Sequence, residues 1–385
     1  MFSLPVIESF IVYTGLLLCI TYLGHTAYQL YCINNNKKTL GYLGIIILIA
    51  LIFSIIFGAR YNVGIDQLNY KRIFEAIQSG NTTDDLIEPG FYLICKIIGT
   101  GGLHSFFFFF SFCLIQISFL LNAFYNKPNL LPYIFIILLA TQFMVMMNLM
   151  RQMTFVCCFI WIVSKRDHIN FIKYLFIIGI CTYFLHKSAI LTLLLYPIIK
   201  SNKNLCTSHA TQILIYIICI YLGYSHFILD KFEDFSAIAS LVGYSQYEGF
   251  NVFEALFMDP NWGPRTLIRF IMVLVAIVLS NRTSYYFKGD DLFIPYYNLF
   301  FWGCCAEVIL YGTNVIARVF LPMYYMKLII FAYTLLYLVT NWKKNYYNLL
   351  SAGLFISLLL MDFSSLFFEA MQPDNSSAYQ FFWQA

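Results

Sequence analysis

The sequence predicts an all-α integral membrane protein that crosses the bilayer many times. Of its 385 residues, 61% are hydrophobic and only 11% are charged, whereas soluble domains carry roughly 25% charged residues. A soluble core cannot absorb this surplus of Phe, Ile, Leu and Tyr. The apolar residues also occur in runs of about 18–20, the length that crosses a bilayer as a helix. We therefore expect one transmembrane domain over residues 1–385.

Polar clusters divide the apolar sequence into about twelve expected spans. Three of them, 150–164, 188–199 and 266–280, are shorter than a full crossing. The first span is expected to be retained, because no small-residue cleavage site follows it. The expected spans are 6–31, 41–59, 103–124, 130–147, 150–164, 170–185, 188–199, 210–228, 266–280, 292–311, 315–340 and 346–363.

Lysine and arginine in the short loops predict the orientation, because cytoplasmic loops carry an excess of both. With the N-terminus outside, the cytoplasmic loops hold twelve basic residues against three acids, Asp167, Asp290 and Asp291. Nearly all other acids then fall on the outer side, mostly in two longer loops, 60–102 and 229–265. The twelve basic residues are Lys37, Lys38, Lys127, Lys165, Arg166, Lys173, Lys200, Lys203, Arg282, Lys288, Lys343 and Lys344.

Four separate pieces of chain bring basic groups to the expected outer face. Arg60 follows the second span, and Arg151 lies between the fourth and fifth. His186 and Lys187 interrupt the apolar sequence between the sixth and seventh spans, and Arg318 lies just inside the eleventh. Each arginine alone is compatible with snorkelling to lipid headgroups. Three arginines and a histidine at one depth favour an anion-binding site.

The order of these motifs between about residues 40 and 340 resembles the EpsG family, bacterial membrane proteins of exopolysaccharide assembly that are grouped with the Wzy-type polymerases of O-antigen, capsule and exopolysaccharide. The motifs are R-x-x-x-G-x-D-x-x-x-Y (Arg60, Gly64, Asp66, Tyr70), E-P-G-F (Glu88 to Phe91), R-Q-M (Arg151 to Met153), H-K-S-A (His186 to Ala189) and a late arginine before a tyrosine-rich span (Arg318, Tyr324, Tyr325).

This resemblance implies a glycosyltransferase at the outer face of the bacterial cytoplasmic membrane. Such a polymerase transfers the growing glycan from undecaprenyl diphosphate to the next lipid-linked oligosaccharide unit and releases undecaprenyl diphosphate. It uses no nucleotide sugar and no cofactor. The expected partners are the lipid-linked oligosaccharide, membrane lipids, a chain-length regulator and a repeat-unit flippase, with no nucleic acid.

Arginine suits the leaving group of that reaction. Breaking the glycosidic bond increases the charge on the diphosphate, so fixed cations stabilise the transition state more than the ground state. A guanidinium also grips two phosphate oxygens at once. We expect Arg151 and Arg318 to bind the diphosphate, with Arg60 as a third candidate and Lys187 beside them.

The acceptor hydroxyl calls for at most a weak general base, a task that suits a carboxylate. Asp66 is the leading candidate, because Asn62 and Gly64 allow a tight turn that places it near Arg60, where an ion pair would keep it charged. The alternative is that Asp66 caps a helix that begins near Leu68.

Glu88 and His186 are the other catalytic candidates. Glu88 precedes Pro89 and is equally suited to cap a short apolar segment, 91–99, that is expected to be re-entrant or interfacial. His186 is suited to donate to a phosphate or to hydrogen-bond a helix end. The loop 229–265 matches none of the motifs and is expected to shape the acceptor site; its candidate sugar contacts are Tyr244, Tyr247, Glu248 and Trp262.

Two further features bear on the chemistry. Lys327 and Glu307 fall within spans, where ionisable groups are paired or functional, and a polar cavity or a carboxylate partner is expected for Lys327. The six histidines are dispersed without a metal-binding pattern, and no P-loop or dinucleotide fingerprint occurs. We therefore expect no metal.

Three rival functions stay open from the sequence. A flippase for lipid-linked sugars would also be polytopic, but such transporters show internal repeats and midplane sites, and we see no repeat here. A ligase that moves finished glycan to another acceptor would use the same basic site. A membrane O-acyltransferase would be expected to draw acyl groups from the cytoplasm, where the loops are short.

Overall fold

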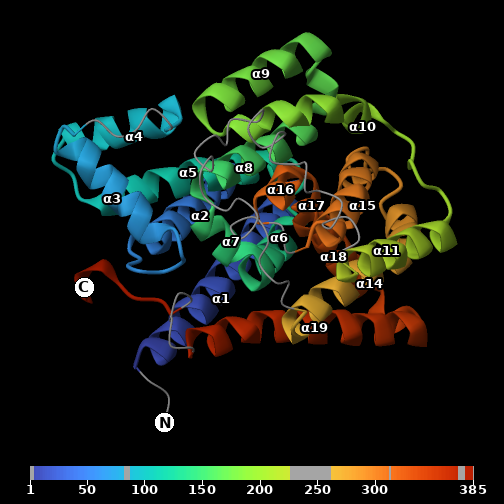
Figure 1. Cartoon of the computed structure of the whole chain (residues 1–385). Coiled ribbons are helices and arrows are strands. Elements are labelled where there is room, and N and C mark those ends of the chain that lie inside the picture. The colour runs from blue at the N-terminus through green and yellow to red at the C-terminus, as the bar shows by residue number, and fades with distance from the viewer. Residues whose placement is uncertain (1–3, 82–86, 226–261, 312–313, 372–377, 385) are drawn as a thin grey trace. The chain divides into compact units, whose positions relative to one another are not determined.

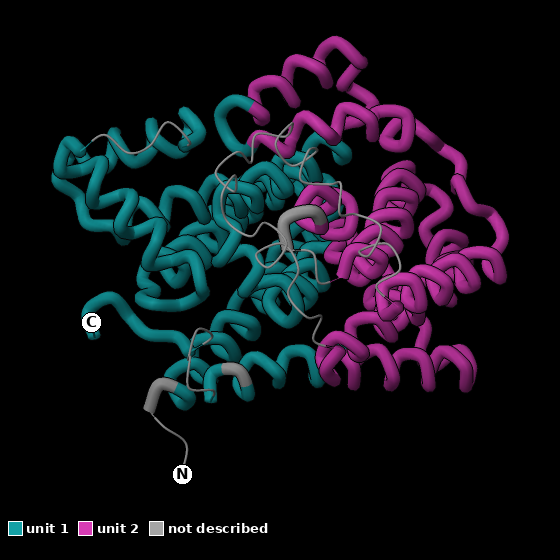
Figure 2. The backbone as a smooth tube through the Cα atoms, in the orientation of Figure 1, with its two compact units in different colours: residues 1–164, 183–186, 359–385 teal, residues 165–182, 187–358 magenta. Residues whose placement is uncertain are grey.

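The computed structural model describes residues 4–81, 87–225, 262–311, 314–371 and 378–384 (Figure 1). Every regular element in these ranges is a helix, apart from one isolated antiparallel bridge between Arg60 and Phe381. The chain divides into two compact units, shown in Figure 2. Unit 1 consists of residues 1–164, 183–186 and 359–385, and unit 2 of residues 165–182 and 187–358.

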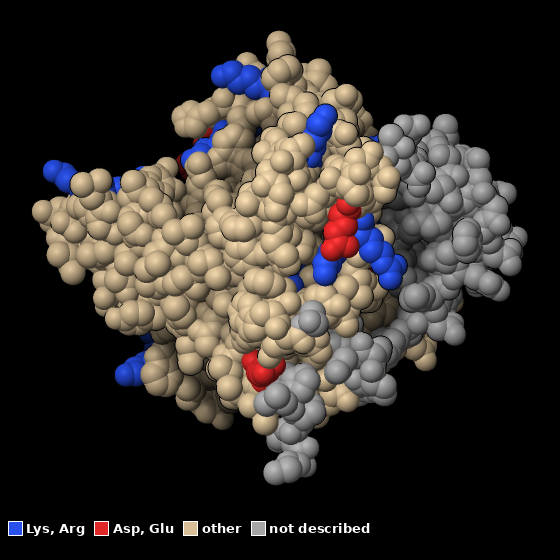
Figure 3. Space-filling model, turned by 90° about the vertical axis from the view of Figure 1, so that its left-hand side faces the viewer, with Lys and Arg blue, Asp and Glu red and all other residues tan. Residues whose placement is uncertain are grey.

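Seven helical stretches in the described ranges are long and apolar enough to cross a membrane, which confirms the polytopic all-α class. They are Val6–Ile33, Leu40–Gly58, Ser105–Phe124, Leu131–Asn148, Pro264–Tyr286, Leu321–Lys344 and Tyr346–Phe368. Shorter apolar helices cover Met150–Ser164, Phe171–Phe184 and His209–Tyr224. Most of the described side chains on the face seen in Figure 3 are uncharged, with a few Lys, Arg, Asp and Glu side chains between them.

The expected number of about twelve spans is not confirmed. The expected span 188–199 is a 3₁₀ helix, Lys187–Leu195, followed by the five-residue helix α10 (Tyr196–Lys200). The expected short span 266–280 is instead part of the 23-residue helix α14 (Pro264–Tyr286), because its polar C-terminal residues continue the helix. The hydrophobicity pattern predicted where the apolar segments lie, but the predicted lengths of these two segments were wrong.

Unit 1 is built around α5 (Ser105–Phe124), which packs against α2 (Leu40–Gly58) and α8 (Met150–Ser164). Helix α1 (Leu4–Ile33) lies against α2 and α6 (Leu131–Ile137). A π-helical turn, Leu138–Gln142, joins α6 to α7 (Phe143–Asn148). The expected outer loop 60–102 contains two short helices in contact with each other, α3 (Gln67–Gln78) and α4 (Pro89–Thr100). At 12 residues each, neither can cross a bilayer.

Loops that the charge pattern assigns to one side of the membrane meet at one end of unit 1. In the two expected cytoplasmic loops, Lys38 donates a hydrogen bond to Asn126, and the Tyr42 hydroxyl donates to the carbonyl of Tyr125 at 3.0 Å. At the expected outer end, the amide of Tyr61 donates to the carbonyl of Gln380 at 2.8 Å. Within unit 1, loops that the sequence assigns to the same side of the membrane thus lie side by side.

Unit 2 is organised around α15 (Phe293–Ile309), which contacts α10, α11 (His209–Tyr224), α14, α17 (Leu321–Tyr324) and α18 (Lys327–Asn341). Two glycines allow this crowding. A Cβ on Gly223 would lie 2.1 Å from the carbonyl oxygen of Val308, and one on Gly303 would lie 2.3 Å from the amide nitrogen of Tyr324. Small residues at such contacts let helix backbones approach closely within a membrane.

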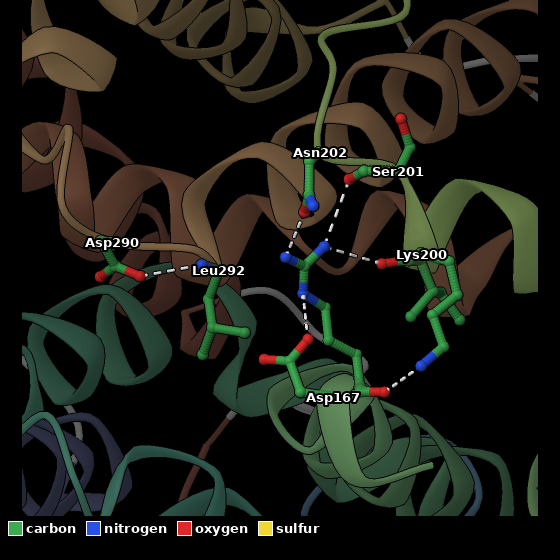
Figure 4. Close-up of polar contacts among 8 residues, drawn as sticks. Asp167, Lys200, Ser201, Asn202, Asp290 and Leu292 are labelled. Carbon is green, nitrogen blue, oxygen red and sulfur yellow. Dashed lines mark hydrogen bonds and ion pairs between the residues drawn. The ribbon is translucent and has the colours of Figure 1, made fainter. Parts of the chain in front are cut away.

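The expected cytoplasmic loops of unit 2 also meet, as Figure 4 shows for the segments that carry Asp167 and Asn202. The Arg166 guanidinium donates to the carbonyls of Ile199 and Ser201, both at 3.2 Å, and to the side chain of Asn202. The ammonium of Lys200 donates back to the carbonyl of Arg166. Arg166 is buried and ties together the loops before α9 (Phe171–Phe184) and after α10. Helix α19 (Tyr346–Ala370) then runs from unit 2 into unit 1.

Candidate active site

A break between two helices concentrates buried polar groups in unit 1. Leu149 leaves helical geometry (φ −91°, ψ 49°) between α7 and α8 and so interrupts the helix at this point. Arg60 Nη2 donates to the carbonyl of Met147 at 2.9 Å, and Gln116 Nε2 donates to the carbonyl of Met150 at 2.9 Å. Non-helical backbone at membrane depth is tolerated only where such partners exist.

Arg60 is a buried cation with a structural task. Its side chain is 1% exposed, and its guanidinium carbon lies 4.0 Å from the ring centroid of Phe57 and 5.1 Å from that of Phe109. Burial lowers the pKa of Arg60 to about 10, which leaves the guanidinium protonated at neutral pH. The expected ion pair with Asp66 is absent, since Nε and Nη1 of Arg60 have no partner among the described residues.

The C-terminal segment, residues 378–384, holds the turn that carries Arg60. Besides the Arg60–Phe381 bridge, the amide of Phe382 donates to the carbonyl of Ala59 at 2.9 Å. Gln67 closes the turn from the other side, because its Nε2 donates to the carbonyl of Arg60 at 2.9 Å. The sequence predicted no role for this C-terminal segment, because no local motif indicates a backbone pairing between residues more than 300 positions apart.

Asp66 stands at the N-cap position of α3, but its side chain makes no capping hydrogen bond. The capping alternative is therefore not supported by a contact. Asp66 is half-buried and follows Gly64, whose positive φ of 89° only glycine adopts without strain. The predicted tight turn is present, whereas a catalytic role for Asp66 stays a prediction.

Arg151 and Glu88 form the best-developed charged pair of unit 1. Arg151 Nη1 lies 2.5 Å from Glu88 Oε2, and the two side chains are 29% and 7% exposed. Arg151 occupies the first turn of α8, while Glu88 precedes α4 without capping it. The guanidinium carbon lies 5.4 Å from the ring centroid of Phe91 and 5.8 Å from that of Tyr70. Three of the sequence motifs thus converge on one cation.

A fourth motif approaches the same place. A Cβ on Gly90 would lie 2.3 Å from the carbonyl oxygen of Phe184, so the glycine after Pro89 lets α4 touch the end of α9. His186 follows two residues later and is half-buried within unit 1. Gly90 of the E-P-G-F segment and Phe184, nearly a hundred residues apart in the chain, are therefore neighbours within unit 1.

Comparison with known families settles what kind of protein has this arrangement. The sequence model of the EpsG family matches residues 43–381. The chain belongs to the EpsG family. No curated protein and no solved structure matches it. Membership of the EpsG family indicates a polymerase-like role in polysaccharide biosynthesis. The matched region includes Phe381, the residue that bridges to Arg60.

Other predicted site residues of this EpsG-family protein lie in unit 2 or outside the described residues. Lys187 is exposed at the start of the 3₁₀ helix, and Arg318 is half-buried in α16 (Asn314–Val319). Trp262 packs in an aromatic cluster with Tyr224, Phe270 and Tyr311. The roles of all three in substrate binding stay predictions. Tyr244, Tyr247 and Glu248 lie outside the described residues.

Lys327 and Glu307 form a second ion pair, in unit 2. Lys327 Nζ lies 2.6 Å from Glu307 Oε1, with side-chain exposures of 8% and 24%, which confirms the carboxylate partner expected for Lys327. Among the described residues, each unit of the EpsG-family protein thus contains a close ion pair between two partly or fully buried side chains. Among the residues that the structure describes, no group of three or more His, Cys, Asp or Glu side chains is arranged to hold a metal ion.

Proposed function

We propose that this EpsG-family protein polymerises undecaprenyl-diphosphate-linked oligosaccharide units at the outer face of the cytoplasmic membrane. The growing glycan is transferred to the incoming unit, and undecaprenyl diphosphate is released. The observation that carries this proposal is the placement of Arg151 on the first turn of α8, in an ion pair with Glu88.

The positive charge of Arg151 adds to the positive potential at the N-terminus of α8. The first turn of a helix presents backbone N–H groups without intrahelical acceptors, and the helix dipole makes that end positive. An arginine there is unfavourable unless an anion neutralises it. Glu88 supplies one negative charge, and a diphosphate would supply more charge and more acceptor oxygens. The pair therefore resembles an anion site whose own carboxylate occupies it while no substrate is bound.

The same placement suits the chemistry of the transfer. As the bond between the anomeric carbon and the diphosphate breaks, negative charge grows on the bridging oxygen, and a fixed guanidinium stabilises it. The rings of Tyr70 and Phe91 cover part of the Arg151 guanidinium, and such partial burial strengthens its interaction with an anion. Asp66 and His186 stay candidates for assisting the acceptor hydroxyl.

The test is a reconstitution of the purified protein with one lipid-linked oligosaccharide unit as sole substrate. The expected result is a ladder of longer glycans, together with one undecaprenyl diphosphate for each bond made. Heat-inactivated protein is the control.

A flippase is the alternative with a structural argument, because the broken helix α7–α8 is of a kind that transporters use at their binding sites. In proteoliposomes, a flippase would move the lipid-linked unit between leaflets without forming a glycosidic bond. That outcome overturns the proposal. Product that forms only when a different, non-repeating acceptor is added would indicate a ligase.

A further inference from the structure

Tyr70 is a buried tyrosine of α3 whose ring lies close to Arg151. Helix α3 buries one face, which contains Gln67, Tyr70 and Phe74, at the spacing of three and four residues that places side chains on one side of a helix. The ring of Tyr70 packs against that of Phe91, with centroids 5.8 Å apart, and its centroid lies 5.8 Å from the guanidinium carbon of Arg151. Tyr70 is 6% exposed. It therefore joins both short helices of the expected outer loop to the first turn of α8.

The hydroxyl of Tyr70 makes a contact that the ring alone could not make. The Arg151 guanidinium donates a hydrogen bond to this hydroxyl, in addition to its ion pair with Glu88. A phenylalanine would fill the same space against Phe91, so packing alone does not require a tyrosine here. A tyrosine hydroxyl usually finds a hydrogen-bond partner when it is buried, and here a partner is the cation of the candidate site.

The two hydrogen-bond partners of Arg151 differ in charge. Glu88 neutralises the guanidinium and competes with any anion that binds there. The Tyr70 hydroxyl is neutral, so it restricts the direction of the guanidinium without reducing its charge. A guanidinium has five N–H donors, and one carboxylate oxygen and one hydroxyl together leave donors for phosphate oxygens. When a diphosphate replaces Glu88, Tyr70 is the neighbour that can hold Arg151 in place.

The turn that carries Arg60 fixes the start of the helix on which Tyr70 lies. Gln67, one turn before Tyr70, is 1% exposed and donates to the carbonyl of Arg60 at 2.9 Å. Arg60 in turn donates to the carbonyl of Met147 in α7, just before the break that separates α7 from α8. The start of α3 is therefore tied to this break twice within unit 1, once through Arg60 and once through the contact of Tyr70 with Arg151.

We propose that Tyr70 is a positioning residue that holds Arg151 in the direction in which it binds the diphosphate of the lipid-linked substrate, an inference that rests on the proposed polymerase function. Preorganised donors stabilise a transition state because they do not have to reorient as charge develops. Without the hydroxyl, the guanidinium keeps its charge but is free to turn away from the leaving group. Tyr70 acts through Arg151 and takes no proton in the transfer.

The experiment is a double-mutant cycle in the reconstituted assay. Tyr70→Phe removes only the hydroxyl and should lower kcat by about 10–10²-fold with KM little changed, because a misdirected group loses transition-state stabilisation. In an Arg151→Ala background, the same change should cost less than about threefold, since the residue through which it acts is gone. A change that only loosened the packing would lower activity equally in both backgrounds.

Tyr42→Phe is the matched control. The Tyr42 hydroxyl donates to the carbonyl of Tyr125 at 3.0 Å, at the expected cytoplasmic end of unit 1, so this variant loses a tyrosine hydrogen bond far from the candidate site. Its turnover per folded molecule should equal that of the wild type. The folded fraction of every variant is measured by gel filtration and thermal unfolding.

Failure of the positioning role can be told apart from failure of the polymerase function. If the wild type makes a ladder and Tyr70→Phe makes it at the same rate, or if the losses of Tyr70→Phe and Arg151→Ala multiply, only the positioning role fails. If the wild type makes no ladder, the polymerase function fails, and calorimetric titration with inorganic pyrophosphate then tests Tyr70. Weaker binding by Tyr70→Phe but not by Tyr42→Phe supports its role, and equal binding by both overturns it.

Discussion

Arg60 and Arg151 lie at the same end of unit 1, yet their surroundings are opposite. Arg60 is 1% exposed, has no carboxylate partner among the described residues and donates to the carbonyl of Met147. Arg151 has a side chain that is 29% exposed and is paired with Glu88. Both lie at the break between α7 and α8. Arg60 reaches the break from the end of α2, whereas Arg151 belongs to the first turn of α8.

The difference shows how one residue type takes two tasks. A buried guanidinium that satisfies backbone carbonyls is committed, because moving it would leave those carbonyls unpaired. A partly exposed guanidinium neutralised by one carboxylate can exchange that partner for another anion. An arginine with a structural role is therefore distinguished from an arginine of a candidate site by the exposure of its side chain and by the kind of partner that it binds.

The largest expected effect comes from Arg151→Ala. Losing one preorganised donor to the leaving group should lower kcat by about 10²–10³-fold. Because Glu88, at 7% exposure, loses its cationic partner, thermal stability should fall as well, and activity is therefore expressed per folded molecule. Arg72→Ala is the matched control, since Arg72 is an exposed arginine on α3 of the same unit. Equal losses in both variants would mean that surface charge alone matters.

Arg60→Ala should act on stability instead. It leaves the carbonyl of Met147 unpaired and opens a cavity between Phe57 and Phe109, which together should cost about 2–4 kcal/mol. The measurement is the thermal or denaturant unfolding of the detergent-solubilised protein, with activity expressed per folded molecule. Full stability combined with loss of product would instead make Arg60 a substrate ligand.

Gly64→Ala should disturb the turn that follows Arg60. The new Cβ would lie 1.9 Å from Asn148 Oδ1, at a φ of 89°. We expect a loss of about 1–3 kcal/mol in the free energy of unfolding. Gly80→Ala separates the two causes, because Gly80 has a similar φ of 81° with nothing within 4 Å of its Cβ position. If both variants lose the same amount, the clash with Asn148 contributes nothing.

The smallest expected effect belongs to Glu88→Gln. If Glu88 only neutralises Arg151, its removal frees the guanidinium, and inorganic pyrophosphate should bind a few-fold more tightly while kcat changes little. Calorimetric titration with pyrophosphate measures the first quantity. If turnover instead slows by about 10²-fold or more, the loss expected for a general base, Glu88 belongs among the catalytic residues.

The helical class could be predicted from the sequence, because the length of each apolar run can be read from the run itself. The loops that lie together at one end of a unit could be predicted from the lysines and arginines within each loop. The Arg151–Glu88 pair could be anticipated only as two separate candidates, since no sequence signal joins residues so far apart in the chain. The burial of Arg60 could not be predicted at all. It depends on the break at Leu149, which contains neither proline nor glycine.

The C-terminal segment carries one more consequence, for how the protein is made. Residues 378–384 leave the ribosome after all the membrane helices that the structure describes, yet they pair with residues 59–61 near the start of the chain. The pairing with residues 59–61 can therefore form only after this segment has been translated. A chain that stops before residue 378 would have the membrane helices described here but would lack the pairing that closes the turn around Arg60.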